Sequence, residues 1–157
     1  MNEPWKFPIE ERVRWGDVDA ASIIFYGAYI RFFEFAETEL FRAVGLPYSV
    51  MFDELDVWLP RAHLECDFRS AAQLDDLLVV SVYVGRIGTK SIRLNFEVRR
   101  KGEAGLVAEA HFVLVAVRRV TFETVEVPKE LRRRLAPYTA PAASATEAGH
   151  LRDKDNV

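Results

Sequence analysis

Apolar residues recur every three or four positions over residues 27 to 44, which predicts one long helix. One face of this helix carries Tyr29, Phe33, Ala36, Leu40 and Val44. Further phenylalanines widen the apolar surface beyond a single stripe, as expected for a helix around which a sheet curls. Gly45 permits a left-handed backbone and Pro47 cannot continue the helical hydrogen bonds, so the helix is expected to end there.

After residue 60 the apolar period changes to two, which is typical of half-buried strands. The alternation runs over residues 62–68, 78–84, 92–98 and 106–117. We expect a further strand at 10–15, and short helices at 48–55 and 129–135. Turn-forming residues separate the strands, so neighbours should pair in antiparallel hairpins. The pattern predicts an α+β fold, in which a curved antiparallel sheet of five or six strands wraps one long central helix.

The chain has 157 residues, which suits a single domain. We assign residues 1–138 to this domain and expect a disordered tail at 139–157, because the tail has almost no large apolar side chains. No apolar run is long enough to span a membrane and the N-terminus lacks the apolar core of a signal peptide, so we expect a cytoplasmic protein.

Charge and cysteine content exclude several classes of function. The net charge of −3 excludes the broad positive field of a nucleic-acid-binding protein. Cys66 is the one cysteine, which excludes an intramolecular disulfide and a thiolate zinc cluster, and we expect it to be an inert core residue. Carboxylates, hydroxyls and backbone dipoles remain as candidate functional groups.

Candidate chemistry gathers between the first strand and the long helix, where Asp17 and Asp19 precede helical N–H groups that have no partner within the helix. Such a helix end binds an anion or polarises a carbonyl. A carboxylate beside it is the minimum needed to hydrolyse an activated acyl group. Asp-x-Asp also occurs in magnesium sites and in ordinary turns, and from spacing alone a turn or helix cap is the first interpretation.

The stretch RVRWGDVDAASIIFYGAYIRFFEFAETELFRAVGLP resembles the opening of the 4-hydroxybenzoyl-CoA thioesterase family of hotdog-fold proteins. The resemblance continues through DFRSAAQLDDLLVV and GRIGTKSIRLNFEVRR and ends with EVPKELRRRL, so that it covers roughly residues 8 to 136. It implies the hotdog fold and the hydrolysis of an acyl-CoA thioester, with no metal or redox cofactor.

Residue by residue, the resemblance places Asp19 on the family's catalytic carboxylate and Asp17 on a structural acid. Tyr26 falls where the backbone N–H at the start of the helix faces the thioester carbonyl. Ser22 replaces a common glycine. Tyr26 also stands where the short-chain branch usually has histidine, which favours an aromatic, 4-hydroxybenzoyl-CoA-like substrate. Whether Asp19 attacks the thioester or activates water stays open.

The phosphates of CoA need a local basic cluster on an acidic protein. The candidates near the family's phosphate-contact turn are Arg86, Lys90, Ser91 and Arg93, with Arg118 and Arg119 at the end of a neighbouring strand. Among the helix glutamates, Glu34 is kept as a pocket residue, whereas Glu37 and Glu39 are expected at solvated or interface positions.

The histidines show no metal-ligand spacing along the sequence, and we expect no metal site; they are His63, His111 and His150. Two alternatives to an acyl-CoA thioesterase stay open: an acyl-carrier-protein thioesterase, and a non-catalytic hotdog protein that binds an acyl or aromatic ligand. A sheet with an open edge and a groove with one wall predict a homodimer or homotetramer.

Overall fold

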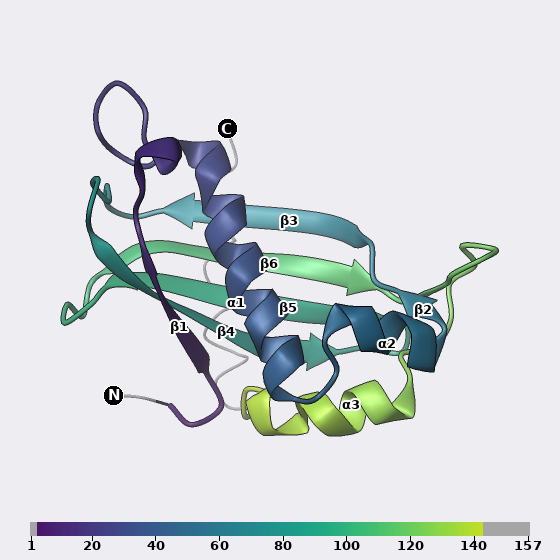
Figure 1. The fold of residues 1–157 in the computed structure, drawn as a ribbon. Helices are drawn as coiled ribbons and strands as arrows, with labels where there is room; N and C mark the ends of the chain where they lie inside the picture. Colours follow the sequence, from purple (N-terminus) through teal and green to yellow (C-terminus); the bar gives the residue numbers. More distant parts are fainter. Residues whose placement is uncertain (1–2, 143–157) are drawn as a thin grey trace, which may run out of the picture.

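The structure is a computed structural model that describes residues 3–142. One antiparallel sheet of five strands has the order β1-β4-β5-β6-β3 (Figure 1). Its strands are β1 (Phe7–Arg12), β3 (Arg61–Phe68), β4 (Leu77–Ile87), β5 (Ser91–Arg100) and β6 (Leu106–Val115). A second, two-stranded sheet pairs β2 (Val57–Trp58) with β7 (Val117–Arg118).

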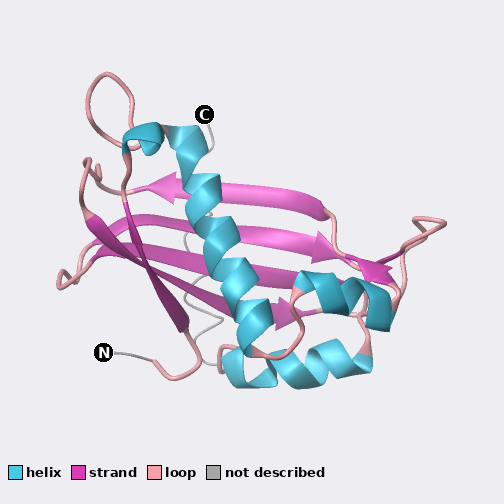
Figure 2. Ribbon diagram, in the orientation of Figure 1, coloured by secondary structure: helices cyan, strands magenta, loops and turns pink. Residues whose placement is uncertain are grey.

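Within residues 3–142 three α-helices complete the fold: α1 (Tyr29–Ala43), α2 (Tyr48–Leu55) and α3 (Lys129–Leu135). Three short 3-10 turns accompany them: η1 (Trp15–Asp17), η2 (Tyr26–Ala28) and η3 (Ala136–Tyr138). Figure 2 shows α1 lying across one face of the five-stranded sheet, with α2 and α3 beside its C-terminal end. Among the described residues, no helix is both long and apolar enough to cross a membrane.

The core lies between α1 and the sheet, as the two apolar periods predict. Phe33 on the buried face of α1 packs 5.0 Å from Phe96 of β5 and 5.8 Å from Phe112 of β6, measured between ring centroids. Alternate residues of β4 and β5 point to the same layer and are fully buried. The expected α+β architecture of one long helix on an antiparallel sheet is therefore confirmed.

The predicted bounds of α2 and α3 match the structure, whereas the first strand begins and ends earlier than expected. The ladder between β1 and β4 ends at Arg12, and beyond it the N–H of Val13 donates to the carbonyl of Asp76 at 2.9 Å while the carbonyl of Val13 accepts the N–H of Asp75 at 3.1 Å. The chain then enters η1 and the loop that precedes α1. This early end of the strand lengthens the loop that carries the candidate acids.

The prediction that one row of β3 faces the core is wrong for most of that row. Leu64 and Phe68 retain 45% and 53% of their exposure, because β3 is the edge of the sheet and α1 packs nearer to β1 and β4. The opposite edge is β1, which contains Pro8. Because proline limits further strand pairing, β3 rather than β1 is the edge strand open to pairing with another strand, and it also exposes apolar side chains.

The first residues of the expected tail are ordered against the sheet. Ala140 donates its N–H to the carbonyl of Val84 at 2.9 Å, and the hydroxyl of Thr139 donates to the carbonyl of Leu135 at 3.1 Å. Residues 143–157, the remainder of that tail, lie outside the described residues.

Candidate functional site

Asp17 is buried, and its hydrogen bonds hold the loop before α1 in place. Its Oδ1 accepts a hydrogen bond from Nε of Arg31 at 2.7 Å, and its Oδ2 accepts from the N–H of Arg14 at 2.8 Å and from Nη2 of Arg31. Arg31 also reaches Glu11 at 3.4 Å. Both oxygens of Asp17 are therefore engaged, which leaves this carboxylate holding the loop to α1 and β1.

Asp19 lies two residues further on and is exposed. Its Oδ1 accepts the N–H of Ala21 at 2.8 Å and its carbonyl accepts the N–H of Ser22 at 2.9 Å, so the loop folds tightly around it. Ser22 has φ of 59°, a left-handed conformation that glycine adopts more easily. The carboxylate of Asp19 is thus held by its own loop while remaining open to solvent.

A small hairpin connects Asp19 to the start of the helix. Val18 bridges Ile24, and the N–H of Asp19 donates to the carbonyl of Ile23 at 3.1 Å. The N–H of Phe25 donates to the backbone carbonyl of Asp17 at 3.1 Å, so the buried acid also positions the turn that begins at Tyr26.

Tyr26 opens η2, which leads directly into α1. The first N–H groups of a helix have no acceptor within it and carry the positive end of its dipole. Aromatic side chains are exposed around this helix start: Trp15, Phe25, Tyr26 and Phe68. The loop therefore combines an exposed carboxylate, a helix start and an apolar surround.

The candidate phosphate-binding residues lie at the other end of the sheet. The loop of Asp19 contacts the start of β4 through the bridge from Ile23 to Gln73, whereas Lys90 follows the end of β4. β4 has eleven residues, so its ends are about 33 Å apart at roughly 3.3 Å per residue. A single protomer does not bring Lys90 and Asp19 together.

The individual basic candidates have different surroundings. Lys90 is exposed and its Nζ donates to Oγ1 of Thr124 at 3.4 Å, whereas Ser91 is half-buried at the start of β5. Arg86 is exposed and is the register partner of Arg93, whose Nε donates to Oδ1 of Asn95 at 3.0 Å.

The arginines after β6 face acids of α2 and its C-terminal end. Arg119 forms an ion pair with Asp53 at 2.7 Å and donates to the carbonyl of Phe52 at 3.0 Å. Arg118 lies 3.7 Å from Asp56. The guanidinium of Arg119 therefore binds groups of α2.

Glu37 was expected at a solvated or interface position, and that expectation is wrong. Glu37 is fully buried in α1, where its Oε1 accepts hydrogen bonds from the hydroxyl of Tyr48 and from Nη2 of Arg61. Burial raises the pKa of Glu37, against the opposing effects of Arg61 and Tyr48. A signal was present in the sequence, because Glu37 follows Phe33 by one helical turn on the apolar face. Glu34 is exposed.

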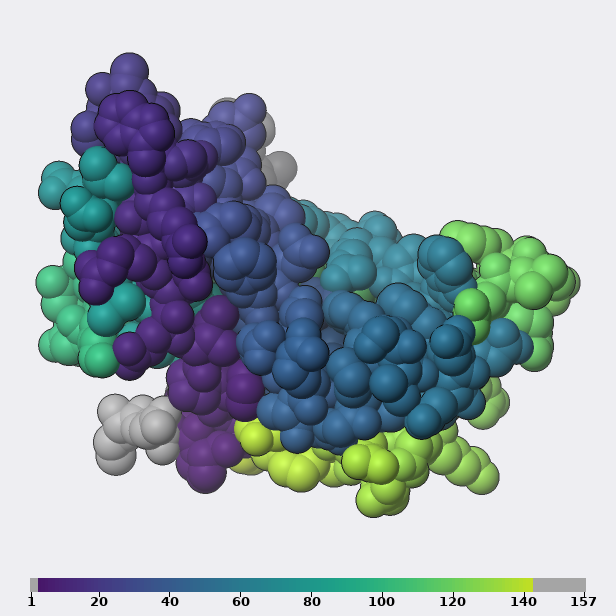
Figure 3. Space-filling view, viewed as in Figure 1, coloured from purple at the N-terminus to yellow at the C-terminus, as the bar shows by residue number. Residues whose placement is uncertain are grey.

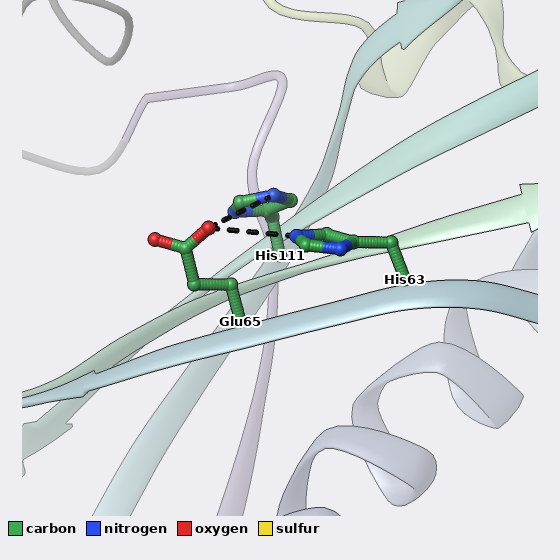
Figure 4. Close-up of side chains that lie close together, drawn as sticks. All are labelled: His63, Glu65 and His111. Atoms are coloured by element: carbon green, nitrogen blue, oxygen red, sulfur yellow. Dashed lines mark hydrogen bonds and ion pairs between the residues drawn. The ribbon is translucent and has the colours of Figure 1, made fainter. Parts of the chain in front are cut away.

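A second cluster of titratable side chains lies on the sheet face opposite α1. Figure 4 shows Glu65 and His63 from β3 beside His111 from β6, with the carboxylate of Glu65 directed at both rings. Burial lowers the pKa of His111, and Arg93 and His63 act in the same direction. Sequence spacing misses this cluster because the pairing of β3 with β6 creates it. His150 lies outside the described residues.

Cys66 points to the other face of β3 and is half-buried. Burial raises the pKa of its thiol to about 11, so the thiol is protonated at neutral pH. The protonated thiol is the unreactive form, which agrees with an inert residue.

Comparison with known proteins places this geometry in a family. Residues 13–135 match the thioesterase-like superfamily. An acyl-CoA thioesterase YbgC from Haemophilus influenzae is 28% identical over 132 residues, which cover 84% of this chain and 94% of that protein. A 1,4-dihydroxy-2-naphthoyl-CoA hydrolase from Prochlorococcus marinus is 22% identical over 130 residues, covering 78% of this chain and 85% of that protein.

A solved structure shares the fold. The 1,4-dihydroxy-2-naphthoyl-CoA thioesterase Slr0204 from Synechocystis superposes with a TM-score of 0.77 at 19% identity, covering 83% of this chain and 96% of that one. The hotdog architecture expected from the sequence is thereby confirmed. The family match includes the loop of Asp17 and Asp19, the helix start at Tyr26 and all of α1. The chain therefore belongs to the thioesterase-like superfamily and is a thioester hydrolase.

Proposed function

We propose that the protein hydrolyses an acyl-CoA thioester whose acyl group is aromatic. The observation that carries this proposal is the exposed carboxylate of Asp19, held on the same small hairpin that leads into the helix start at Tyr26. A carboxylate and unpaired helical N–H groups are the two groups that acyl transfer needs.

In this mechanism the backbone N–H of Tyr26 donates to the thioester oxygen as negative charge develops on it. Asp19 either attacks the carbonyl carbon or takes a proton from the attacking water. If Asp19 attacks, the C–S bond breaks to give a mixed anhydride, and water then cleaves that anhydride and restores the carboxylate of Asp19. If Asp19 activates water, the water adds to the acyl carbon and the C–S bond then breaks. By either route the CoA thiolate leaves and takes up a proton. The products are the free acid and CoA.

The apolar surround of the helix start supports an aromatic acyl group. Trp15, Tyr26 and Phe68 expose ring surface beside the loop, and aromatic rings pack against one another with added stability. The names of two similar proteins specify naphthoyl-CoA, which is an aromatic acyl thioester. We therefore favour a benzoyl-like or naphthoyl-like substrate.

We further propose a homodimer that pairs two β3 strands. Figure 3 shows the outline recessed along β3, between the protruding loop before α1 and the green 119–123 loop. Antiparallel pairing about a two-fold axis reverses the second copy along the strand direction. It would bring the partner's Lys90 turn toward this chain's Asp19 loop, and it would cover Leu64 and Phe68.

A panel of thioesters tests the substrate class. Release of CoA, measured with a thiol-trapping dye, is compared for benzoyl, 4-hydroxybenzoyl, hydroxynaphthoyl and straight-chain acyl-CoA. We expect an aromatic ester to be preferred by about tenfold or more in kcat/KM, because an aromatic acyl group can pack against the exposed rings around the helix start, with added ring–ring stability. Equal or faster turnover of straight-chain esters contradicts the aromatic assignment. The same acyl group presented on acyl-carrier protein, whose freed thiol the dye also traps, is assayed beside the CoA ester, and faster turnover of that thioester contradicts the CoA assignment.

Light scattering tests the dimer. We expect Leu64→Lys to shift the protein toward a monomer and to lower activity, because a charge replaces apolar surface on the pairing strand. Val120→Lys makes the same change at an exposed site in the 119–123 loop and should leave the dimer intact. A fully active monomeric wild-type protein at micromolar concentration would rule out the shared site. The expected cytoplasmic location stays a prediction.

A further inference from the structure

Three potential metal ligands meet on the face of the sheet that α1 does not cover. Glu65 of β3 is the register partner of His111 of β6. His63 precedes Glu65 by two residues, so its side chain points to the same face. The buried residues of β6 alternate with His111 and point to the α1 side, which places the cluster on the outer face.

The three side chains converge on one point. Nε2 of His63 lies 3.5 Å and Nε2 of His111 lies 3.8 Å from Oε2 of Glu65 (Figure 4). One potential ligand atom from each residue lies within 4.8 Å of the other two. In a tetrahedral zinc site with bonds of about 2.0–2.2 Å, neighbouring ligand atoms are about 3.4 Å apart. The cluster therefore needs only a small side-chain movement to enclose an ion.

The donor set selects the class of ion. Two imidazole nitrogens and one carboxylate oxygen suit zinc and the neighbouring late transition metals. Magnesium and calcium prefer sites built of oxygen ligands, so they fit poorly. Three protein ligands leave a fourth position for water.

Exposure of the cluster permits an ion to enter. His111 and Glu65 retain 14% and 21% of their side-chain exposure, whereas His63 retains 54% and forms the open side. Arg93 is a positive charge that acts on His111, and its Nε donates a hydrogen bond to Oδ1 of Asn95 at 3.0 Å. Asp67, two residues beyond Glu65 on the same face, adds a negative charge.

We propose that His63, Glu65 and His111 bind a divalent zinc-class cation that links the edge strand β3 to β6. The site lies on the sheet face opposite α1, so the ion has a structural effect and takes no part in thioester hydrolysis. Because binding to the folded chain stabilises it, zinc should raise the melting temperature. The inference does not depend on the proposed substrate.

The test uses the untagged full-length protein after treatment with a chelator. Calorimetric titration with zinc chloride should show one saturable site per chain, and magnesium chloride should show none at equal concentration. His63→Ala, Glu65→Gln and His111→Ala should each weaken zinc binding by more than about tenfold, since each removes a ligand. Circular dichroism of the metal-free variants checks that they are folded.

Matched controls address other ligands on the chain. Cys66→Ala removes a thiol from the same strand, and His150→Ala removes the third histidine of the sequence; both should bind zinc like the wild type. Zinc should raise the melting temperature of the wild type and of these controls, and leave that of His111→Ala unchanged. Zinc affinity that survives His111→Ala, or no saturable zinc binding by the wild type, would overturn the proposal.

Discussion

Asp17 and Asp19 are the same chemical group, two residues apart on one loop, yet their environments are opposite. Asp17 is buried, and Arg31 and the backbone of Arg14 occupy both of its oxygens. Asp19 is exposed, and its side chain accepts a hydrogen bond from Ala21 of its own loop. A buried carboxylate with every oxygen paired stabilises a fold, whereas an accessible one is free to react.

The largest expected effect is on catalysis at Asp19. Asp19→Asn should lower kcat by about 10²–10⁴, because an amide neither accepts a proton nor attacks a thioester well. The variant retains an oxygen that can accept the N–H of Ala21, so its melting temperature should stay near that of the wild type. Steady-state kinetics and thermal unfolding measure the two effects, and near-wild-type turnover would show that Asp19 is not the catalytic carboxylate.

The opposite effect is expected at Asp17. Asp17→Asn should lower the free energy of unfolding by about 2–3 kcal/mol, because a neutral amide replaces the buried carboxylate that pairs with Arg31, and the charged contact of Arg31 to Glu11 is longer, at 3.4 Å. Urea denaturation measures this loss. Glu39→Gln is the matched control, because it removes an exposed ion pair with Arg42 that contributes at most about 1 kcal/mol. A larger loss of kcat at Asp17 than at Asp19 would reverse their assignment.

Glu37 extends the comparison to a buried carboxylate with one unpaired oxygen. Its Oε2 has no hydrogen-bond partner, and burial raises its pKa despite Arg61 and Tyr48. The native state therefore binds a proton at Glu37 more tightly than the unfolded state does. The contribution of Glu37 to the free energy of unfolding falls as pH rises from the ordinary glutamate pKa through the raised pKa.

Glu37→Gln removes this titration while keeping an acceptor for Tyr48 and Arg61. As pH rises from the ordinary glutamate pKa through the raised pKa of Glu37, the free energy of unfolding of the wild type should fall relative to that of the variant. Urea denaturation of both proteins at several pH values measures the difference. A difference that moves in the opposite direction would show that the ion pair with Arg61 outweighs burial.

Lys90 tests whether the active site extends beyond the Asp19 loop. Lys90→Ala should raise KM severalfold and leave kcat nearly unchanged, as expected for a screened contact to a CoA phosphate. Raised salt should mimic the variant. A pantetheine thioester lacks the nucleotide phosphates and serves as the control. Equal weakening of the pantetheine substrate would mean that Lys90 does not contact those phosphates.

The smallest effect is expected at Ser22, which holds the Asp19 loop in a left-handed conformation. Ser22→Gly relieves about 1–2 kcal/mol of backbone strain but adds about 0.5–1 kcal/mol of unfolded-state entropy. The net gain should be at most about 1.5 kcal/mol, which corresponds to at most roughly 3–6 °C in melting temperature. Ser22→Ala keeps the strain and should show no gain; an equal gain in both variants would exclude backbone strain as the cause.

Local pattern alone predicted most of the elements. The helical period of residues 27–44 and the alternation after residue 60 identify α1 and the long strands, because these periods depend only on which side of an element meets the core. Gly45 and Pro47 mark the end of α1, and the limits of α2 and α3 were also predicted. The candidate acids and the helix start were recognised from consecutive residues.

Tertiary structure decided which of these groups are buried, paired or brought together. Arg31 makes Asp17 structural, and Tyr48 with Arg61 makes the burial of Glu37 tolerable. The position of β3 at the sheet edge leaves Leu64 exposed, although its alternation resembles that of a core strand. His63 and His111 become neighbours only through strand register, because side chains distant along the chain meet where the backbone ladder places them.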